Sequence, residues 1–97
     1  MIVLSKQLFL KTVEINILWF THKKNIKYVD GYIKQVENSI SENFNDKGEK
    51  KFNGLKELYQ FVANKIVENN DLKDIVDTER LTDNIINDLG EKYKYSE

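Results

Sequence analysis

Residues 13–20 read V-E-I-N-I-L-W-F, and no other stretch of the chain is as apolar. Six of these eight side chains are hydrophobic, and they include the only tryptophan, Trp19. Because large apolar side chains gain most by leaving water, we expect the segment to lie at the bottom of the hydrophobic core. The secondary structure of this stretch therefore decides the fold.

The stretch fits two kinds of secondary structure. As a strand, its apolar and polar residues alternate, which is typical of a half-buried sheet. As a helix over residues 5–22, it begins at Ser5 as the N-cap, and Phe9, Val13 and Ile17 follow at the four-residue spacing of one helix face. A lone strand would lack a partner for its backbone hydrogen bonds. Since the rest of the chain has helical patterning, we favour the helix.

A second helix is predicted over residues 26–44. An apolar residue occurs there at every third or fourth position, which is the spacing of one helix face. These positions are Ile26, Val29, Ile33, Val36, Ile40 and Phe44. Asp30-Gly31 within it is also a common hairpin signal. A glycine costs a helix only about 1 kcal/mol relative to alanine, so we favour a helix that bends or breaks at Gly31.

Two further helices complete the pattern. Residues 45–51 are polar and contain Gly48, so we predict a loop, followed by a helix that Asn53 caps. Residues 72–76 suggest one short turn. The last helix is predicted to start at Asp77 or Thr78 and to end at Gly90. Its buried face comprises Leu81, Ile85, Ile86 and Leu89, and Tyr93 beyond it reaches back onto the core.

These elements predict a single all-α domain over residues 1–97, a small up-and-down bundle of about four helices. The 97 residues suffice for one core, and 40% of them are hydrophobic. The alternative is an α+β fold in which an N-terminal β-hairpin or meander precedes two helices. It would follow if residues 13–20 were a strand or if Asp30-Gly31 were a hairpin turn.

The composition argues against several kinds of chemistry. The chain has no cysteine and a single histidine, His22, which lies among polar residues. Thiol catalysis and clusters of metal-binding cysteines and histidines are therefore excluded, and no acids pair in an apolar setting. We predict no enzymatic activity, no cofactor and no metal site. The absence of a long apolar stretch or signal peptide predicts a cytoplasmic protein with no membrane span.

The best candidate for a binding site is the lysine- and tyrosine-rich segment at residues 22–34. Its predicted contact residues are Lys23, Lys24, Lys27, Tyr28 and Tyr32. Tyrosines at the edge of a helix face are typical anchors for a protein partner, which includes a second copy of the chain in a homodimer. The alternative is a nucleic-acid-binding accessory protein that uses the same lysines and rings. A sequence pI near 5.9 and a single arginine argue against nucleic-acid binding.

The order of features over residues 32–90 resembles the soluble helical part of the LL-H type of phage holins. The similar features are Val36-Glu37, then Gly48 with Lys50 and Lys51, then Asp77-x-Glu79-x-Leu81 leading into Ile85, Ile86 and Leu89. Holins of that type begin with a membrane span, which this chain does not have. The resemblance implies phage or prophage origin. We therefore predict a small non-catalytic accessory or inhibitor protein, encoded by a phage or mobile element, that binds another protein.

Overall fold

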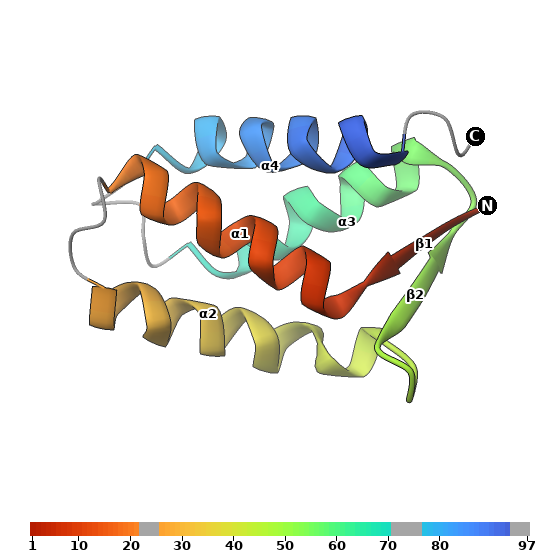
Figure 1. Cartoon of the computed structure of the whole chain (residues 1–97), viewed down its shortest axis with the longest axis horizontal. Coiled ribbons are helices and arrows are strands. Elements are labelled where there is room, and N and C mark those ends of the chain that lie inside the picture. Colours follow the sequence, from red (N-terminus) through yellow and green to blue (C-terminus); the bar gives the residue numbers. More distant parts are fainter. Residues whose placement is uncertain (22–25, 71–76, 94–97) are drawn as a thin grey trace.

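The structure is a computed structural model that describes residues 1–21, 26–70 and 77–93. In these ranges four helices form a compact globule, and a small two-stranded antiparallel sheet lies at one end (Figure 1). The elements are β1 (Ile2–Ser5), α1 (Lys6–Phe20), α2 (Ile26–Ile40), a short 3-10 turn (Ser41–Asn43), β2 (Glu49–Phe52), α3 (Leu55–Glu68) and α4 (Thr78–Tyr93). The prediction of a mainly helical fold is confirmed, with the sheet as an addition to it.

The helices follow one another up and down. Figure 1 shows α1 between α2 and α4, with α3 behind it, and consecutive helices run in opposite directions. Helix α1 packs against α2 and α4, and α3 packs against α4 and α2. The alternative with an N-terminal hairpin is wrong, because Asp30-Gly31 and residues 13–20 lie inside helices.

Helix α1 starts as its sequence indicates. The Ser5 Oγ accepts a hydrogen bond from the backbone N–H of Leu8 over 3.3 Å, so this side chain caps the helix. Phe9, Val13 and Ile17 recur at a spacing of four residues and are completely buried. The helical interpretation of residues 13–20 is therefore confirmed.

The expectation that this whole stretch lies in the core is wrong. Trp19 is 76% exposed and Ile15 is 53% exposed, whereas the polar Asn16 is only 6% exposed. Successive residues of a helix are about 100° apart, so a residue two positions from a buried one faces roughly the opposite side. Ile15 and Trp19 each follow a buried residue by two positions and thus point outward.

Helix α2 continues through the predicted hairpin signal. Gly31 lies within it, and a Cβ added there would meet nothing within 4 Å. Val29, Val36 and Ile40 form the buried face. Phe44 continues this face beyond the short 3-10 turn and is 9% exposed. The helical interpretation of this segment is confirmed, but the predicted break at Gly31 is wrong, because one helix runs from Ile26 to Ile40.

The prediction that residues 45–51 form only a loop is wrong. The turn occupies their first part, where Gly48 has a φ of +72° and the Asn45 Oδ1 accepts from the backbone N–H groups of Lys47 and Glu49. Strand β2 then begins at Glu49 and pairs antiparallel with β1, so that Phe52 lies opposite Ile2. Both of these side chains are buried. Phe52 is the apolar residue of β2, and β1 supplies the buried Ile2 and Leu4 beside it.

The start of α3 also differs from the prediction. Gly54, not Asn53, is the N-cap residue. Asn53 lies one position earlier, and its backbone N–H and side-chain amide donate to the Glu57 carboxylate over 3.1 and 3.2 Å. Here the acid of the first turn reaches back to the entering chain, as in a capping box. The predicted turn at residues 72–76 lies outside the described residues.

Helix α4 starts as predicted but ends later. The Asp77 Oδ1 accepts from the backbone N–H groups of Glu79 and Arg80, so Asp77 caps the helix. The prediction that Gly90 ends it is wrong, because the helix runs on to Tyr93. Tyr93 is half-buried and packs against the core, as expected. A Cβ on Gly90 would lie 2.6 Å from the Tyr59 Oη, so this glycine makes room for the Tyr59 side chain of α3.

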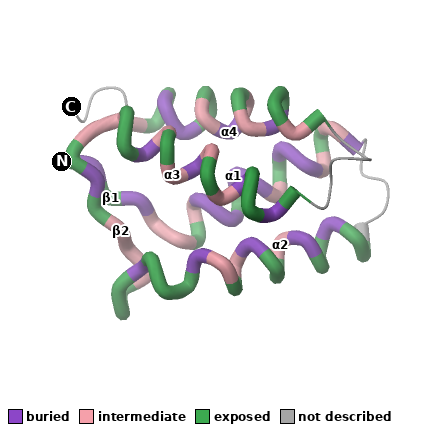
Figure 2. Tube along the Cα trace, turned by 180° about the vertical axis from the view of Figure 1, so that it is seen from behind, coloured by how far each residue is buried: buried purple, intermediate pink, exposed green. Residues whose placement is uncertain are grey.

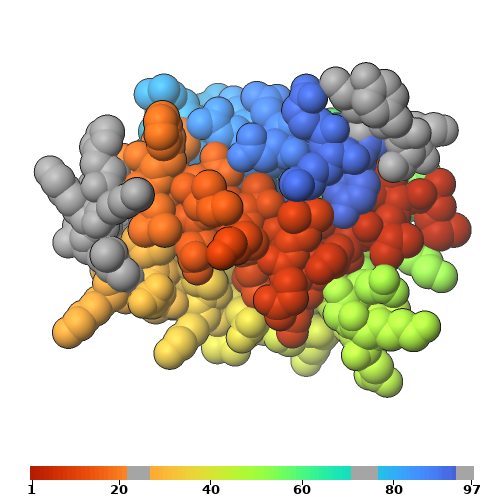
Figure 3. Space-filling model, in the orientation of Figure 1, coloured from red at the N-terminus to blue at the C-terminus, as the bar shows by residue number. Residues whose placement is uncertain are grey.

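One hydrophobic core joins all these elements, and buried positions recur along each helix (Figure 2). Its buried members are Ile2, Leu4, Phe9, Leu10, Val13, Ile17, Val29, Tyr32, Val36, Ile40, Phe44, Phe52, Leu58, Val62, Ile66, Leu81, Ile85 and Leu89. In the space-filling view α1 crosses the middle of one face, with α4 above and α2 below (Figure 3). That face carries the exposed side of α1.

Candidate functional site

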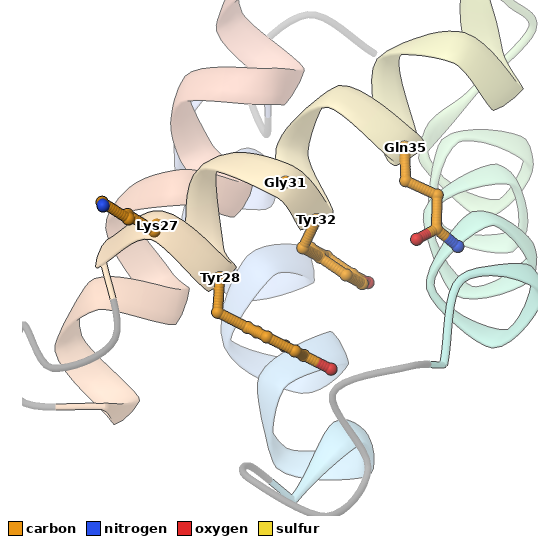
Figure 4. A pocket seen from close by; sticks show the side chains of 5 residues that line it. All are labelled: Lys27, Tyr28, Gly31, Tyr32 and Gln35. Atoms are coloured by element: carbon orange, nitrogen blue, oxygen red, sulfur yellow. The ribbon is translucent and has the colours of Figure 1, made fainter.

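The predicted contact segment is only partly at the surface. Tyr28 is 44% exposed and Lys27 is exposed, but Tyr32 is 2% exposed and belongs to the core. Lys23 and Lys24 lie outside the described residues. The two tyrosine rings leave the same side of α2 and point the same way, whereas Lys27 points away from them (Figure 4). The ring of Tyr32 therefore offers little surface to a partner.

These residues surround a surface hollow of about 310 Å³. It is lined by Lys27, Tyr28, Gly31, Tyr32 and Gln35. Figure 4 shows the Gln35 amide one turn beyond Tyr32. The described lining thus combines two phenol rings, an amide and one lysine, which suits polar contacts better than apolar ones.

The sequence-based site missed the most exposed aromatic ring of the described chain, Trp19. This residue continues a stripe along α1 in which every fourth residue is exposed. The stripe consists of Gln7, Lys11, Ile15 and Trp19. The half of the stripe toward the C-terminal end of α1, Ile15 and Trp19, is apolar. An exposed tryptophan beside an exposed isoleucine is rare on surfaces that face only water. The helical period of the buried residues was the signal that would have located these two side chains outside.

Beside this stripe a hollow of about 410 Å³ runs between α1 and α4. Residues of both helices line it, namely Ile15, Asn16, Trp19, Asn84, Asn87 and Asp88. We call this set of six residues the α1–α4 face. The wall from α1 combines the apolar Ile15 and Trp19 with the Asn16 amide, and the wall from α4 consists of two amides and a carboxylate.

A hydrogen bond under the hollow holds the two helices in register. The Asn16 Nδ2 donates to the Asp88 Oδ2 over 2.9 Å and to the backbone carbonyl of Thr12 over 2.8 Å. Asn16 is almost completely buried, so the folded protein would lose much stability if its amide had no acceptors. The bond also orients the Asp88 carboxylate along the wall of the hollow.

The charge of the α1–α4 face is negative. Asp88 is the one charged residue of this face. In the described ranges no lysine or arginine forms an ion pair with Asp88; the ion pair found in those ranges joins Lys65 and Glu68. At the end of the face, the Arg80 guanidinium lies 5.7 Å from the centre of the Phe20 ring, a cation–π distance. A carboxylate beside an accessible indole ring is suited to a cationic side chain from a partner.

A second hollow, of about 480 Å³, lies on the other side of the stripe, between α1 and α2. Its lining includes Leu8, Lys11, Glu14, Ile33 and Glu37. Helix α1 is therefore a ridge with a groove on each side, in the middle of the face that Figure 3 shows. Ridges and grooves of this kind are what a second helix packs against.

The described residues offer little for catalysis or metal binding. Within residues 1–21, 26–70 and 77–93, no group of three or more His, Asp or Glu side chains is arranged to hold a metal ion. Burial raises the pKa of Tyr93 above its ordinary value of 10.0. None of the helices in these ranges is long and apolar enough to cross a membrane.

Comparison with known proteins adds no identity. No protein family, curated protein or solved structure matches the chain. The resemblance of residues 32–90 to phage holins of the LL-H type therefore stays a prediction. The function must be argued from the surface itself.

Proposed function

We propose that this protein acts by binding another protein chain through the α1–α4 face. The observation that carries the proposal is the exposed tryptophan: Trp19 is 76% exposed beside Ile15, which is 53% exposed. Tryptophan is the residue most enriched at the energetic centres of protein interfaces. A partner that covers these two side chains also meets hydrogen-bonding amides and the Asp88 carboxylate at the rim.

The energy available from this ring is large enough to matter. An aromatic side chain buries about 150–250 Å² when fully covered, and roughly three quarters of Trp19 is accessible. At about 25 cal/mol per Å², covering the accessible part of the Trp19 side chain contributes about 3–5 kcal/mol to the free energy of binding. Part of this offsets the loss of translational and rotational freedom on association.

Such a mode of action fits a small accessory or inhibitor protein. The proposed phage or mobile-element origin is supported by the resemblance of residues 32–90 to phage holins of the LL-H type. The nucleic-acid alternative, which uses residues 22–34, is weakened by the burial of Tyr32, because a core ring cannot stack on a base. It keeps Lys27, Lys34 and the half-exposed Tyr28 in the described part of the segment.

Photo-cross-linking in the native host tests the proposal. A photo-reactive phenylalanine analogue at position 19 of the full chain is expected to give protein adducts on irradiation. The same analogue at position 67 is the control, because Val67 is also apolar and 70% exposed but lies on α3. Equal adducts at both positions, or none at position 19, would contradict the proposal. A retarded band with labelled DNA or RNA that weakens steeply with salt would favour the nucleic-acid alternative.

A further inference from the structure

We propose that the partner of the α1–α4 face is a second copy of this chain, in a two-fold symmetric dimer whose α1 helices lie antiparallel. Each α1 ridge packs into the groove between α1 and α4 of the other copy. This inference rests on the protein-binding function proposed above, and it commits that function to one occupant. Three features of the exposed surface support it.

The first feature is the spacing of the exposed stripe on α1. Lys11 and Trp19 are each four residues from Ile15, on either side of it, and all three side chains are exposed. A two-fold axis at Ile15 therefore sets Ile15 against itself and brings Lys11 of one copy to Trp19 of the other. The Ile15 contact lies on the axis and occurs once, and the Lys11–Trp19 contact occurs twice, as an isologous interface requires.

The second feature is complementary charge. Lys11 is exposed, and no carboxylate in the described ranges pairs with it, while Asp88 is the acid of the groove that Trp19 lines. In the proposed dimer the Lys11 ammonium of one copy enters the groove of the other. There it reaches both the face of the indole ring and the Asp88 carboxylate. Within the described ranges neither Lys11 nor Asp88 has an ion-pair partner, and the proposed dimer brings the two charges together.

The third feature is shape. Helix α1 stands between two hollows of about 410 and 480 Å³, and only the one toward α4 carries the exposed indole. When two such surfaces meet, each ridge has a groove to enter, and α1 and α4 of both copies pack as a four-helix bundle. The face has far fewer residues than the roughly 20–30 per side of a standard interface. We therefore expect weak association, with a dissociation constant on the order of micromolar or above.

Sedimentation velocity of the purified full chain, from about 1 µM to 1 mM, tests the dimer. We expect a concentration-dependent shift from monomer to dimer. Trp19→Ala is expected to weaken self-association roughly a hundredfold, because a two-fold interface feels the change twice. Lys11→Glu is expected to weaken it roughly tenfold through repulsion from Asp88. Val67→Ala, a change at an apolar residue of α3 that is 70% exposed, is expected to leave self-association unchanged.

Disulfide cross-linking tests the position of the two-fold axis, because the natural chain has no cysteine. Under oxidised glutathione, Ile15→Cys is expected to form a covalent dimer rapidly, since the two thiols face each other across the axis. Lys11→Cys lies one turn away on the same stripe and is as exposed, but its thiols are too far apart in the antiparallel dimer for a disulfide. Equal rates for the two variants would overturn the proposed axis.

The outcomes separate this inference from the proposed function. A chain that stays monomeric at the highest concentration, or a dimer that Trp19→Ala does not weaken, would overturn the second copy as occupant. If position 19 still cross-links to a different protein in the native host, protein binding through this face stands. If position 19 gives no protein adduct of any kind, both proposals fail. Circular dichroism of each variant establishes that it is folded before its association is measured.

Discussion

The buried amide of Asn16 gives the sharpest prediction about how α1 and α4 are held together. Asn16→Asp keeps the size and shape of the side chain but replaces its two N–H donors with an oxygen. The donors serve the Asp88 carboxylate and the Thr12 carbonyl. The variant therefore loses both hydrogen bonds without leaving a cavity, and it sets two carboxylates against each other.

The size of the effect follows from these contacts. Each lost hydrogen bond costs about 1 kcal/mol. Repulsion between the carboxylates adds about 1 kcal/mol and not more, because Asp88 is exposed and solvent screens it. We expect the free energy of unfolding to fall by about 3 kcal/mol at pH 7, which lowers the melting temperature of a domain of this size by roughly 12–24 °C.

The loss should depend on pH with a definite sign. In the folded variant the carboxyl groups of residue 16 and Asp88 lie side by side and hold one proton between them. They bind this proton more tightly than either carboxyl group does in the unfolded chain. A group that binds its proton more tightly when folded contributes stability at low pH that is lost as pH rises. The destabilisation relative to the natural chain should therefore shrink to about 1–2 kcal/mol near pH 4, because the shared proton restores one donor.

Urea denaturation at pH 7 and pH 4, followed by circular dichroism, measures both values. Asp88→Asn in the Asn16→Asp background should recover about 1 kcal/mol at pH 7, since it removes the second charge. Asp83→Asn, an exposed acid outside the α1–α4 face, is the matched control and should recover nothing. Unchanged stability of Asn16→Asp at pH 7, or a loss that is the same at both pH values, would refute the reasoning.

Three further predictions concern single groups. Gly48→Ala should destabilise the chain by about 1 kcal/mol, because Gly48 has a φ of +72°. The same change at Gly31, which lies within α2 and in open space, should stabilise the chain by up to about 1 kcal/mol. Melting temperatures that shift in the same direction for both variants would contradict the assigned conformations. Gly90→Ala should cost about 1–2 kcal/mol through its clash with the Tyr59 hydroxyl, and in a Tyr59→Phe background it should cost less in a double-mutant cycle. Because burial raises the pKa of Tyr93, folded chain holds this proton more tightly, so stability should fall as pH rises above about 10, and Tyr93→Phe should weaken that dependence in urea titrations.

Local spacing was sufficient to predict most of the helical fold. The buried Phe9, Val13 and Ile17 share one helix face, and the cap at Ser5 begins it, so the helix over residues 13–20 was predictable. The long stripe of α2 outweighed the hairpin signal at Gly31 for the same reason. Helix periodicity is a local property, and each of these predictions depends only on residues near in sequence.

The errors in the predicted secondary structure arose where contacts with distant parts of the chain determine the local structure. Strand β2 has a polar sequence, and it forms because β1, more than forty residues earlier, pairs with it and brings apolar residues to the end of the bundle. Gly90 lies inside α4, where the side chain of Tyr59 from α3 makes a close approach to it. Neither the pairing nor the approach leaves a local signal in the sequence.

The exposure of Trp19 was missed for a different reason. Trp19 was assigned to the core from its hydrophobicity alone, although the predicted helix already directed it away from Val13 and Ile17. The same spacing argument does not separate Tyr28 from Tyr32, since four residues bring both to one side of α2. Which of them is buried depends on the packing of that side, and Tyr32 is the one in the core.

The fluorescence of Trp19 tests the central claim most directly, because it is the only tryptophan in the chain. In the folded chain at submicromolar concentration, acrylamide should quench it nearly as well as in the urea-unfolded chain. As the protein concentration rises, a partner copy should cover the ring, so quenching should become weaker and the emission should shift to shorter wavelength. Weak quenching and blue-shifted emission already at the lowest concentration would show a core tryptophan and contradict the account.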